Sequence, residues 1–249
     1  MTLDLETNGP PQILCDWPIT ITVDMVLRGE GADPAKIRVR QPQLFDLAER
    51  AIVEGYKLIR PRVVFRRLDI SGFSGPIVVL GRGHKLEGSG IARKLAGSQG
   101  VFVAVTTLGK QLEEEMSKAS QENLPWQFAL DGFGTAAIGA LSNAVCRFFQ
   151  ELAAKESFRV TDQFYPGMQG WRLAEGQTQI FALLDANRIG VALSSTFVMR
   201  PRKSLSMVVG FGTEVRTSAH LCDECTVSAK CRHKPANNRI FRWPATHKN

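Results

Sequence analysis

The order of apolar segments along the chain is the feature that most limits its possible folds. Strand-like runs occur at residues 63–70, 77–80, 101–105, 191–193 and 205–211, and helix-like segments at 44–58, 110–120, 131–152 and 175–187. Strands and helices therefore do not alternate one for one, as a parallel sheet with crossover helices requires. The sequence predicts an α+β fold with a mainly antiparallel, twisted sheet and flanking helices.

The longest predicted helix is rich in small residues. Asp131 is expected to cap it, and Ala137, Leu141, Val145 and Phe148 recur at the spacing of one helical face. This spacing is expected to bury one face of the helix.

The chain length and composition limit the domain organisation and location. With 249 residues, 44% of them hydrophobic, the chain can bury a sizeable core. We expect an α+β domain at residues 1–215 and a basic, cysteine-containing segment at 216–249. No apolar run approaches the ~18 residues of a membrane helix, and residues 1–11 lack the pattern of a secretion signal. We therefore predict a cytoplasmic protein with no membrane partner.

The net charge of +7 is concentrated after residue 200. Such a field can attract nucleic acid or another anionic partner. Because no cluster of stacking aromatic residues accompanies it, a solvated basic segment is the favoured interpretation, and nucleic-acid binding is not expected.

A glycine-rich segment at residues 81–90 could in principle hold a phosphate. It lacks the Gly-Lys-Ser/Thr ending of a P-loop, and Leu86 stands where a dinucleotide fingerprint has its third glycine. A flexible connection is the favoured interpretation.

The stretch from Tyr165 to Trp171 reads Tyr-Pro-Gly-Met-Gln-Gly-Trp. A predicted helix follows, then Leu-Ser-Ser-Thr at 193–196 and a Pro-x-x-Ser-x-Ser run at 201–206. This order resembles the activation domain of cobalamin-dependent methionine synthase and its free-standing relatives. Residues 106–109, Thr-Thr-Leu-Gly, add to the resemblance, which covers most of residues 20–215.

The resemblance implies a helmet-like domain that binds S-adenosylmethionine and docks over cobalamin, with a corrinoid protein or methyltransferase as partner. The implied cofactor contacts are Asp16, Gln163, Tyr165, Pro166, Gly167, Met168 and Trp171. Gln163 stands where the family has an arginine that pairs with the ligand carboxylate. Two alternatives stay open: Asp16 as an ordinary turn residue, and Tyr165, Met168 and Trp171 as an aromatic turn that seals the core.

Three of the five cysteines lie close together at Cys222, Cys225 and Cys231. In a reducing compartment such spacing favours metal ligands over disulfides. A [4Fe-4S] cluster is the favoured interpretation, in keeping with the tails of the free-standing relatives, and zinc or unliganded thiols are the alternatives. His220, His233, Cys15 or a small molecule could supply the fourth ligand.

Together these features favour an accessory or catalytic protein of corrinoid-dependent methyl transfer, which reductively activates a cobalamin centre through an iron–sulfur cluster. The rival hypothesis is a binding or scaffold module that kept the fold but lost S-adenosylmethionine binding. The sequence does not indicate the oligomeric state or the substrate.

Overall fold

The computed structural model describes residues 6–215 of the chain. The described residues therefore do not include Cys222, Cys225 and Cys231. They end at the domain boundary expected between residues 215 and 216. The helices are α1 (Val23–Gly29), α2 (Pro34–Arg40), α3 (Pro42–Leu58), α4 (Ser89–Lys94), α5 (Gln111–Glu122), α6 (Leu124–Ala154) and α7 (Leu173–Leu183), with short 3-10 helices η1 (Gly81–Gly83) and η2 (Ala186–Ile189). The strands are β1 (Gln12–Cys15), β2 (Arg62–Ser74), β3 (Ile77–Leu80), β4 (Lys85–Glu87), β5 (Gly100–Thr107), β6 (Arg159–Val160), β7 (Ala192–Leu193), β8 (Met199–Arg200) and β9 (Ser204–Gly212).

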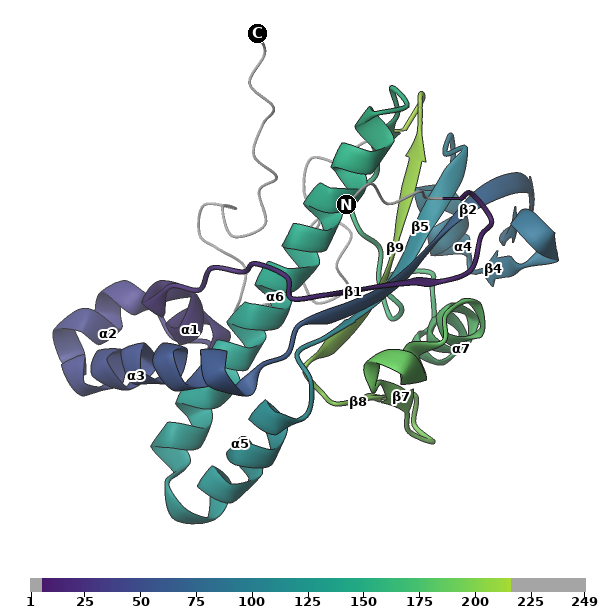
Figure 1. The fold of residues 1–249 in the computed structure, drawn as a ribbon. Helices are drawn as coiled ribbons and strands as arrows, with labels where there is room; N and C mark the ends of the chain where they lie inside the picture. The colour runs from purple at the N-terminus through teal and green to yellow at the C-terminus, as the bar shows by residue number, and fades with distance from the viewer. Residues whose placement is uncertain (1–5, 216–249) are drawn as a thin grey trace, which may run out of the picture.

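One antiparallel sheet organises the fold (Figure 1). Its strand order is β4-β3-β2-β5-β9-β6, and β1 also pairs with β2. The register places Val64 opposite Val105, and Val105 opposite Ser206. Every residue of the central strand β5 is buried. The predicted α+β class with a mainly antiparallel sheet is confirmed.

Successive side chains of a strand point to opposite faces of the sheet, so the core has two layers, one on each face. Phe102 and Ala104 of β5 belong to a cluster that includes α1, α3, α5 and α6. Val101, Val103 and Val105 belong to a second cluster, with α4, α7 and η2. The sheet is therefore covered by helices on both faces.

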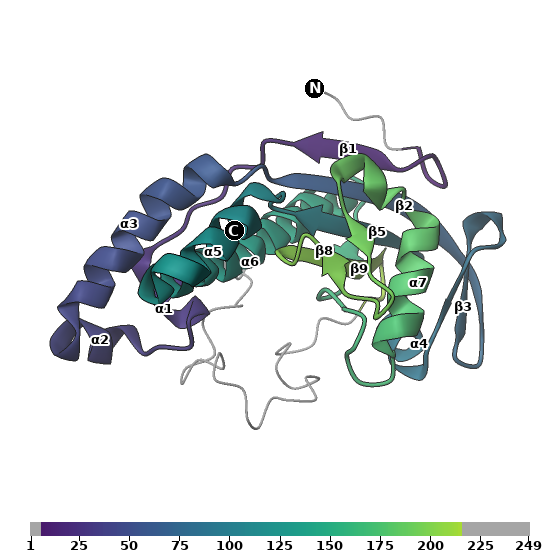
Figure 2. The same ribbon diagram turned by 90° about the horizontal axis from the view of Figure 1, so that it is seen from below.

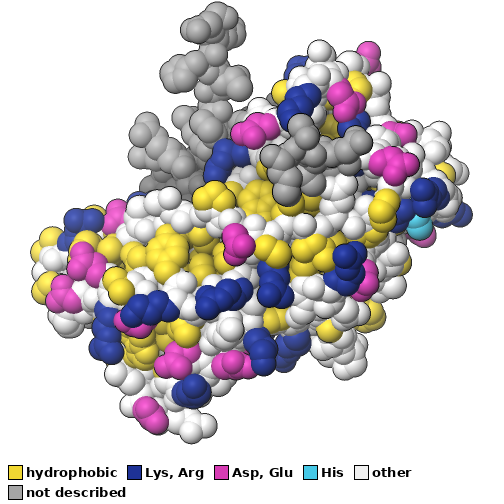
Figure 3. Space-filling view, in the orientation of Figure 1, with side chains coloured by type: hydrophobic (Ala, Val, Ile, Leu, Met, Phe, Trp, Pro, Cys, Tyr) yellow, Lys and Arg dark blue, Asp and Glu magenta, His cyan; other side chains and the backbone are white. Residues whose placement is uncertain are grey.

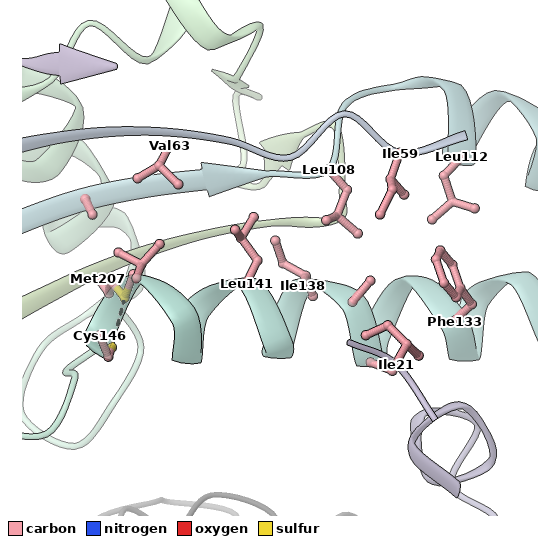
Figure 4. Close-up of a cluster of buried hydrophobic side chains, with 14 of the residues drawn as sticks. Ile21, Ile59, Val63, Leu108, Leu112, Phe133, Ile138, Leu141, Cys146 and Met207 are labelled. Atoms are coloured by element: carbon pink, nitrogen blue, oxygen red, sulfur yellow. Dashed lines mark hydrogen bonds between the residues drawn. The ribbon is translucent and has the colours of Figure 1, made fainter. Parts of the chain in front are cut away.

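Helix α6 is longer than the sequence pattern predicted. It begins at Leu124, where the Asn123 side chain accepts a hydrogen bond from the Trp126 amide at 3.1 Å, so Asp131 is an interior residue and not the cap. The prediction missed the first two turns because their apolar residues, including the exposed Leu124 and Phe128, do not continue the buried stripe. Figure 4 shows Phe133, Ile138 and Leu141 of α6 directed at the neighbouring strands and loops.

The small residues of α6 permit close packing against α1. A Cβ added to Gly29 would lie 2.4 Å from the carbonyl oxygen of Gly132, a distance that no side chain tolerates. Glycine at both positions thus lets the two backbones touch.

Residues 6–215 form an arch (Figure 2). Helices α1, α2, α3, α5 and α6 form one side and α4 and α7 the other, with β1 on the convex side. The loop that leads into α7, and strands β8 and β9, lie on the hollow side. None of the helices in the described part of the chain has the length and apolar character needed to span a membrane.

Candidate functional site

The predicted site is centred on a closed turn at residues 165–171, which we call the aromatic turn. The Met168 amide donates to the Tyr165 carbonyl at 3.1 Å, and the Gly167 amide donates to the Trp171 carbonyl at 2.8 Å. Gly167 and Gly170 have φ angles of 94° and 78°, which glycine adopts without steric cost. Gly167, Gln169 and Gly170 are exposed, so this part of the turn lies at the protein surface.

Two glycines on neighbouring elements hold the aromatic turn in place. A Cβ on Gly90 would lie 2.0 Å from the Gln169 carbonyl oxygen, and one on Gly176 of α7 would lie 2.8 Å from Trp171. The Gly90 amide donates to the Gly170 carbonyl at 2.8 Å. Part of the glycine-rich segment at 81–90 is thus a packing surface for this turn, not the flexible connection expected from sequence.

The residues at the start of the turn extend to opposite faces of the sheet. Phe164 pairs with Val208 of β9 through two backbone hydrogen bonds, and its ring stacks on Trp171 with centroids 5.9 Å apart. Tyr165 points the other way, and its hydroxyl lies 3.3 Å from Ser142 Oγ of α6. The turn is therefore tied to both core layers.

Trp171 and Met168 also make internal contacts. Trp171 is 1% exposed, and its indole N–H donates to Gln179 Oε1 at 3.2 Å. Met168 Sδ accepts from the Tyr165 amide at 3.4 Å and stays partly exposed, as does Pro166. Pro166, Gly167 and Met168 consequently offer more surface to a ligand than Trp171 does.

Gln163, the residue in the position of the family arginine, is buried, with 5% of its surface exposed. Its side chain hydrogen-bonds to the Tyr165 hydroxyl. The amide group carries no charge and is engaged inside the protein, so it supplies no cation for a ligand carboxylate.

Burial keeps the reactive groups behind the turn neutral. It raises the pKa of the Tyr165 hydroxyl, helped by the nearby Cys146, while hydrogen bonds from Ser142 and Gln163 act in the opposite direction. Burial, and secondarily Asp162, raises the pKa of the Cys146 thiol to about 12. Cys146 Sγ lies 3.9 Å from Met207 Sδ of β9 (Figure 4). This cluster positions the turn and provides neither a thiolate nor a phenolate near neutral pH.

Asp16 is not brought to the aromatic turn. It follows β1 with a φ angle of 57°, and its amide donates to the Pro61 carbonyl at 3.2 Å. From β1 to the strand position of Phe164 the sheet crosses four strand spacings, roughly 19 Å. The role predicted for Asp16 stays a prediction.

Sequence reasoning missed a second link to α6, made by Lys203, the residue that precedes β9. Lys203 Nζ lies 2.8 Å from Asp131 Oδ1 and donates to the Asp131 carbonyl at 3.1 Å and to Thr135 Oγ1 at 2.9 Å. Two helical turns further along, Ser142 makes the link to Tyr165. Between them, Gly139 has no atom within 4 Å of the place a Cβ would take, so this face of α6 is open. The available sequence signal was a pair of polar residues, Thr135 and Ser142, seven positions apart in a largely apolar helix.

A cavity of about 620 Å³ lies elsewhere, at the end of the sheet near Arg67, Phe73 and Phe211. None of the predicted site residues lines it. Within residues 6–215 no group of three or more His, Cys, Asp or Glu side chains could hold a metal ion. The predicted cysteine ligands lie outside these residues, so the metal centre stays a prediction.

The curled antiparallel sheet, its flanking helices and the proline-glycine turn beside β9 define the chain as an α+β protein with the fold of a methionine synthase-type reactivation domain. One solved structure to which it is similar is the MetH reactivation domain bound to AdoHcy, with a TM-score of 0.58 and 14% sequence identity over 90% of this chain and 85% of that chain. No protein-family model matches the sequence, and comparison with curated proteins gives no match. The resemblance predicted from sequence is confirmed at the level of the fold.

Proposed function

We propose that this protein serves corrinoid-dependent methyl transfer in the cytoplasm, by docking its hollow side over a cobalamin-carrying protein and supporting reductive activation of the cobalt. The observation that carries this proposal is the fold, which matches a MetH reactivation domain along 90% of the chain. The position of the aromatic turn on the hollow side of the arch supports it (Figure 2).

The surface proposed to meet the corrinoid is apolar and firmly supported. Pro166 and Met168 are partly exposed, and Leu173, which begins α7, is 42% exposed and lies 3.8 Å from the place a Gly167 Cβ would take. Because the turn is fixed by Gly90, Gly176 and the Tyr165 hydroxyl, docking would require little ordering of the chain.

The site fits S-adenosylmethionine only in part. The turn is exposed at Gly167, Gln169 and Gly170, so a ligand can reach its surface. At position 163, however, a buried neutral amide replaces a cation, and the lost charge-assisted contact corresponds to about ten- to a hundredfold weaker binding. We therefore expect weak binding of S-adenosylmethionine or AdoHcy at most.

Electron supply is assigned to the C-terminal cysteines. A [4Fe-4S] cluster held by Cys222, Cys225 and Cys231 would supply one electron at low potential, converting cob(II)alamin to cob(I)alamin as the cluster is oxidised by one electron. A separate low-potential reductant has to restore the cluster. Zinc at the same cysteines would leave only a structural role.

The first test is the metal content of protein prepared without oxygen. Iron and acid-labile sulfide in equal amounts, with broad visible absorbance that bleaches on reduction, are expected. Stoichiometric zinc, or no metal, would rule out the electron-transfer role while leaving docking intact.

The second test is calorimetry with cobalamin, a cobalamin-carrying protein and AdoHcy. Leu173→Glu should weaken binding of the corrinoid, because it places a charge on the apolar docking surface. Val39→Glu on α2 is the matched control, since Val39 is 83% exposed and belongs to the other side of the arch. Equal binding by both variants would contradict the proposed surface.

The burial of Gln163 favours one second candidate, a scaffold module that kept the fold and lost the ligand. It predicts no heat with either corrinoid or AdoHcy.

A further inference from the structure

A buried arginine on the face of the sheet that α7 covers lacks a carboxylate partner. Arg66 of β2 is 8% exposed. Its Nε donates to the Gly9 carbonyl at 2.8 Å, and its Nη1 to the Leu183 carbonyl at 3.4 Å. Both acceptors are neutral, and Nη2 has no hydrogen-bond partner among residues 6–215.

Two further basic groups lie beside Arg66, on the turn between β3 and β4. His84 Nε2 is 3.2 Å from Arg66 Nη1. Since arginine can only donate, Nε2 accepts, and the imidazole is neutral with its proton on Nδ1. Arg82 precedes it with a left-handed φ angle of 60°. Lys and Arg side chains gather around a histidine at this end of the molecule (Figure 3).

The charge of this cluster is not balanced within the described residues. No carboxylate there forms an ion pair with Arg66 or Arg82. The Leu183 carbonyl ends α7 and contributes the negative end of a helix dipole, equivalent to about half a charge against two positive guanidinium groups. Arg66 is buried whereas Arg82 is exposed. The unbalanced charge is therefore costly at Arg66 unless an anion neutralises it.

The direction of the pKa shifts of Arg66 and His84 agrees with an excess of positive charge in this cluster. Burial, and then Arg82, lowers the pKa of Arg66. Burial, followed by Arg66 and Arg82, lowers the pKa of His84. Arg82 is thus close enough to act on both groups.

We propose that Arg66, Arg82 and His84 form a binding site for a phosphate-type oxyanion, independent of the aromatic turn. Arg66 Nη2, the Arg82 guanidinium and His84 Nδ1 supply donors, and guanidinium groups match the geometry of phosphate oxygens. The anion supplies the missing counter-charge. Gly83, which follows Arg82, also has a left-handed φ angle, of 76°, which glycine adopts without steric cost.

The test is an NMR titration of the histidine ring signals of the full chain with inorganic phosphate, with His84→Asn used to assign His84. Phosphate should shift the His84 signals and raise the pKa of His84, because a bound anion offsets the two guanidinium charges. Arg82→Asn should weaken phosphate binding about tenfold or more, because one charge-assisted contact is lost. Asparagine accepts the left-handed φ angle, so the fold is preserved.

Arg93→Asn on the exposed face of α4 removes the same charge outside the cluster and should leave phosphate binding unchanged. Titrations with adenosine monophosphate and acetate distinguish a nucleotide, free phosphate and a carboxylate. No His84 response to phosphate, equal responses to acetate and phosphate, or equal weakening by Arg93→Asn would each overturn the proposal.

Discussion

The hydroxyl of Tyr165 and the Oγ of Ser142 lie 3.3 Å apart, and this contact joins the aromatic turn to the longest helix of the protein. Both side chains reach into the core layer between α6 and the sheet, where Met207 Sδ also lies 3.6 Å from Ser142 Oγ. The shape of the candidate site is thus set by a helix that belongs to the other side of the arch.

Removal of the Tyr165 hydroxyl should destabilise the protein. Tyr165→Phe removes the hydroxyl that Ser142 and Gln163 contact and leaves Ser142 Oγ only the weak acceptor Met207 Sδ. We expect the free energy of unfolding to fall by about 1–2 kcal/mol in urea denaturation. Because the two groups share one contact, the loss in Tyr165→Phe/Ser142→Ala should be smaller than the sum of the single losses. Strict additivity would show that the contact contributes nothing.

Two glycine-to-alanine variants should have opposite effects. Gly90→Ala places a Cβ 2.0 Å from the Gln169 carbonyl oxygen, so the turn must move, and we expect a loss of more than about 2 kcal/mol together with altered binding at the turn. Gly139→Ala fills open space on α6 and should stabilise the protein by about 0.5–1 kcal/mol. Thermal unfolding of the two variants checks both effects, and a neutral Gly90→Ala would contradict the tight packing.

Glu30 should make stability depend on pH. Burial against α6, and then Asp131, raises the pKa of Glu30 from 4.5 to about 7. The folded state therefore binds this proton more tightly than the unfolded state, so the contribution of Glu30 is most favourable below about pH 4.5 and becomes unfavourable as the pH rises towards 7.

Replacement of Glu30 by Gln should remove this dependence. At pH 8 Glu30→Gln should be more stable than the native chain by about 1–2 kcal/mol, a value reduced for solvent screening of a half-exposed carboxylate, and near pH 4.5 the two should be alike. Denaturation across this pH range measures the difference, with Glu49→Gln on the exposed face of α3 as control. A constant difference at all pH values would disprove the assignment.

Lys203 should contribute more to stability than an ordinary surface lysine. Its side chain is 15% exposed and has three acceptors, on Asp131 and Thr135. We expect Lys203→Met to lower the free energy of unfolding by about 1–2 kcal/mol, whereas Lys110→Met, whose exposed pair with Glu114 is solvated, should change it by less than about 0.5 kcal/mol. Equal effects would show that Lys203 acts as a surface charge.

Much of the fold could be predicted because it depends on local patterns. The proline at position 42 and the apolar spacing after it located α3, and the Val-rich run at 101–105 located the buried strand β5. The start of α6 could not be read in the same way, because its first turns extend beyond the core and carry exposed apolar residues.

In the candidate site, too, some features follow from local sequence patterns and others depend on contacts between distant residues. The sequence by itself determined that a proline-glycine turn would stand before α7, since Gly167 and Gly170 are needed for its backbone, and it placed three cysteines beyond residue 216. Only the tertiary structure decided that Gln163 is buried against Tyr165, that Asp16 lies across the sheet from the turn, and that Arg66 meets His84. These relationships depend on strand order and register, which join residues far apart in the chain and leave no local pattern in the sequence.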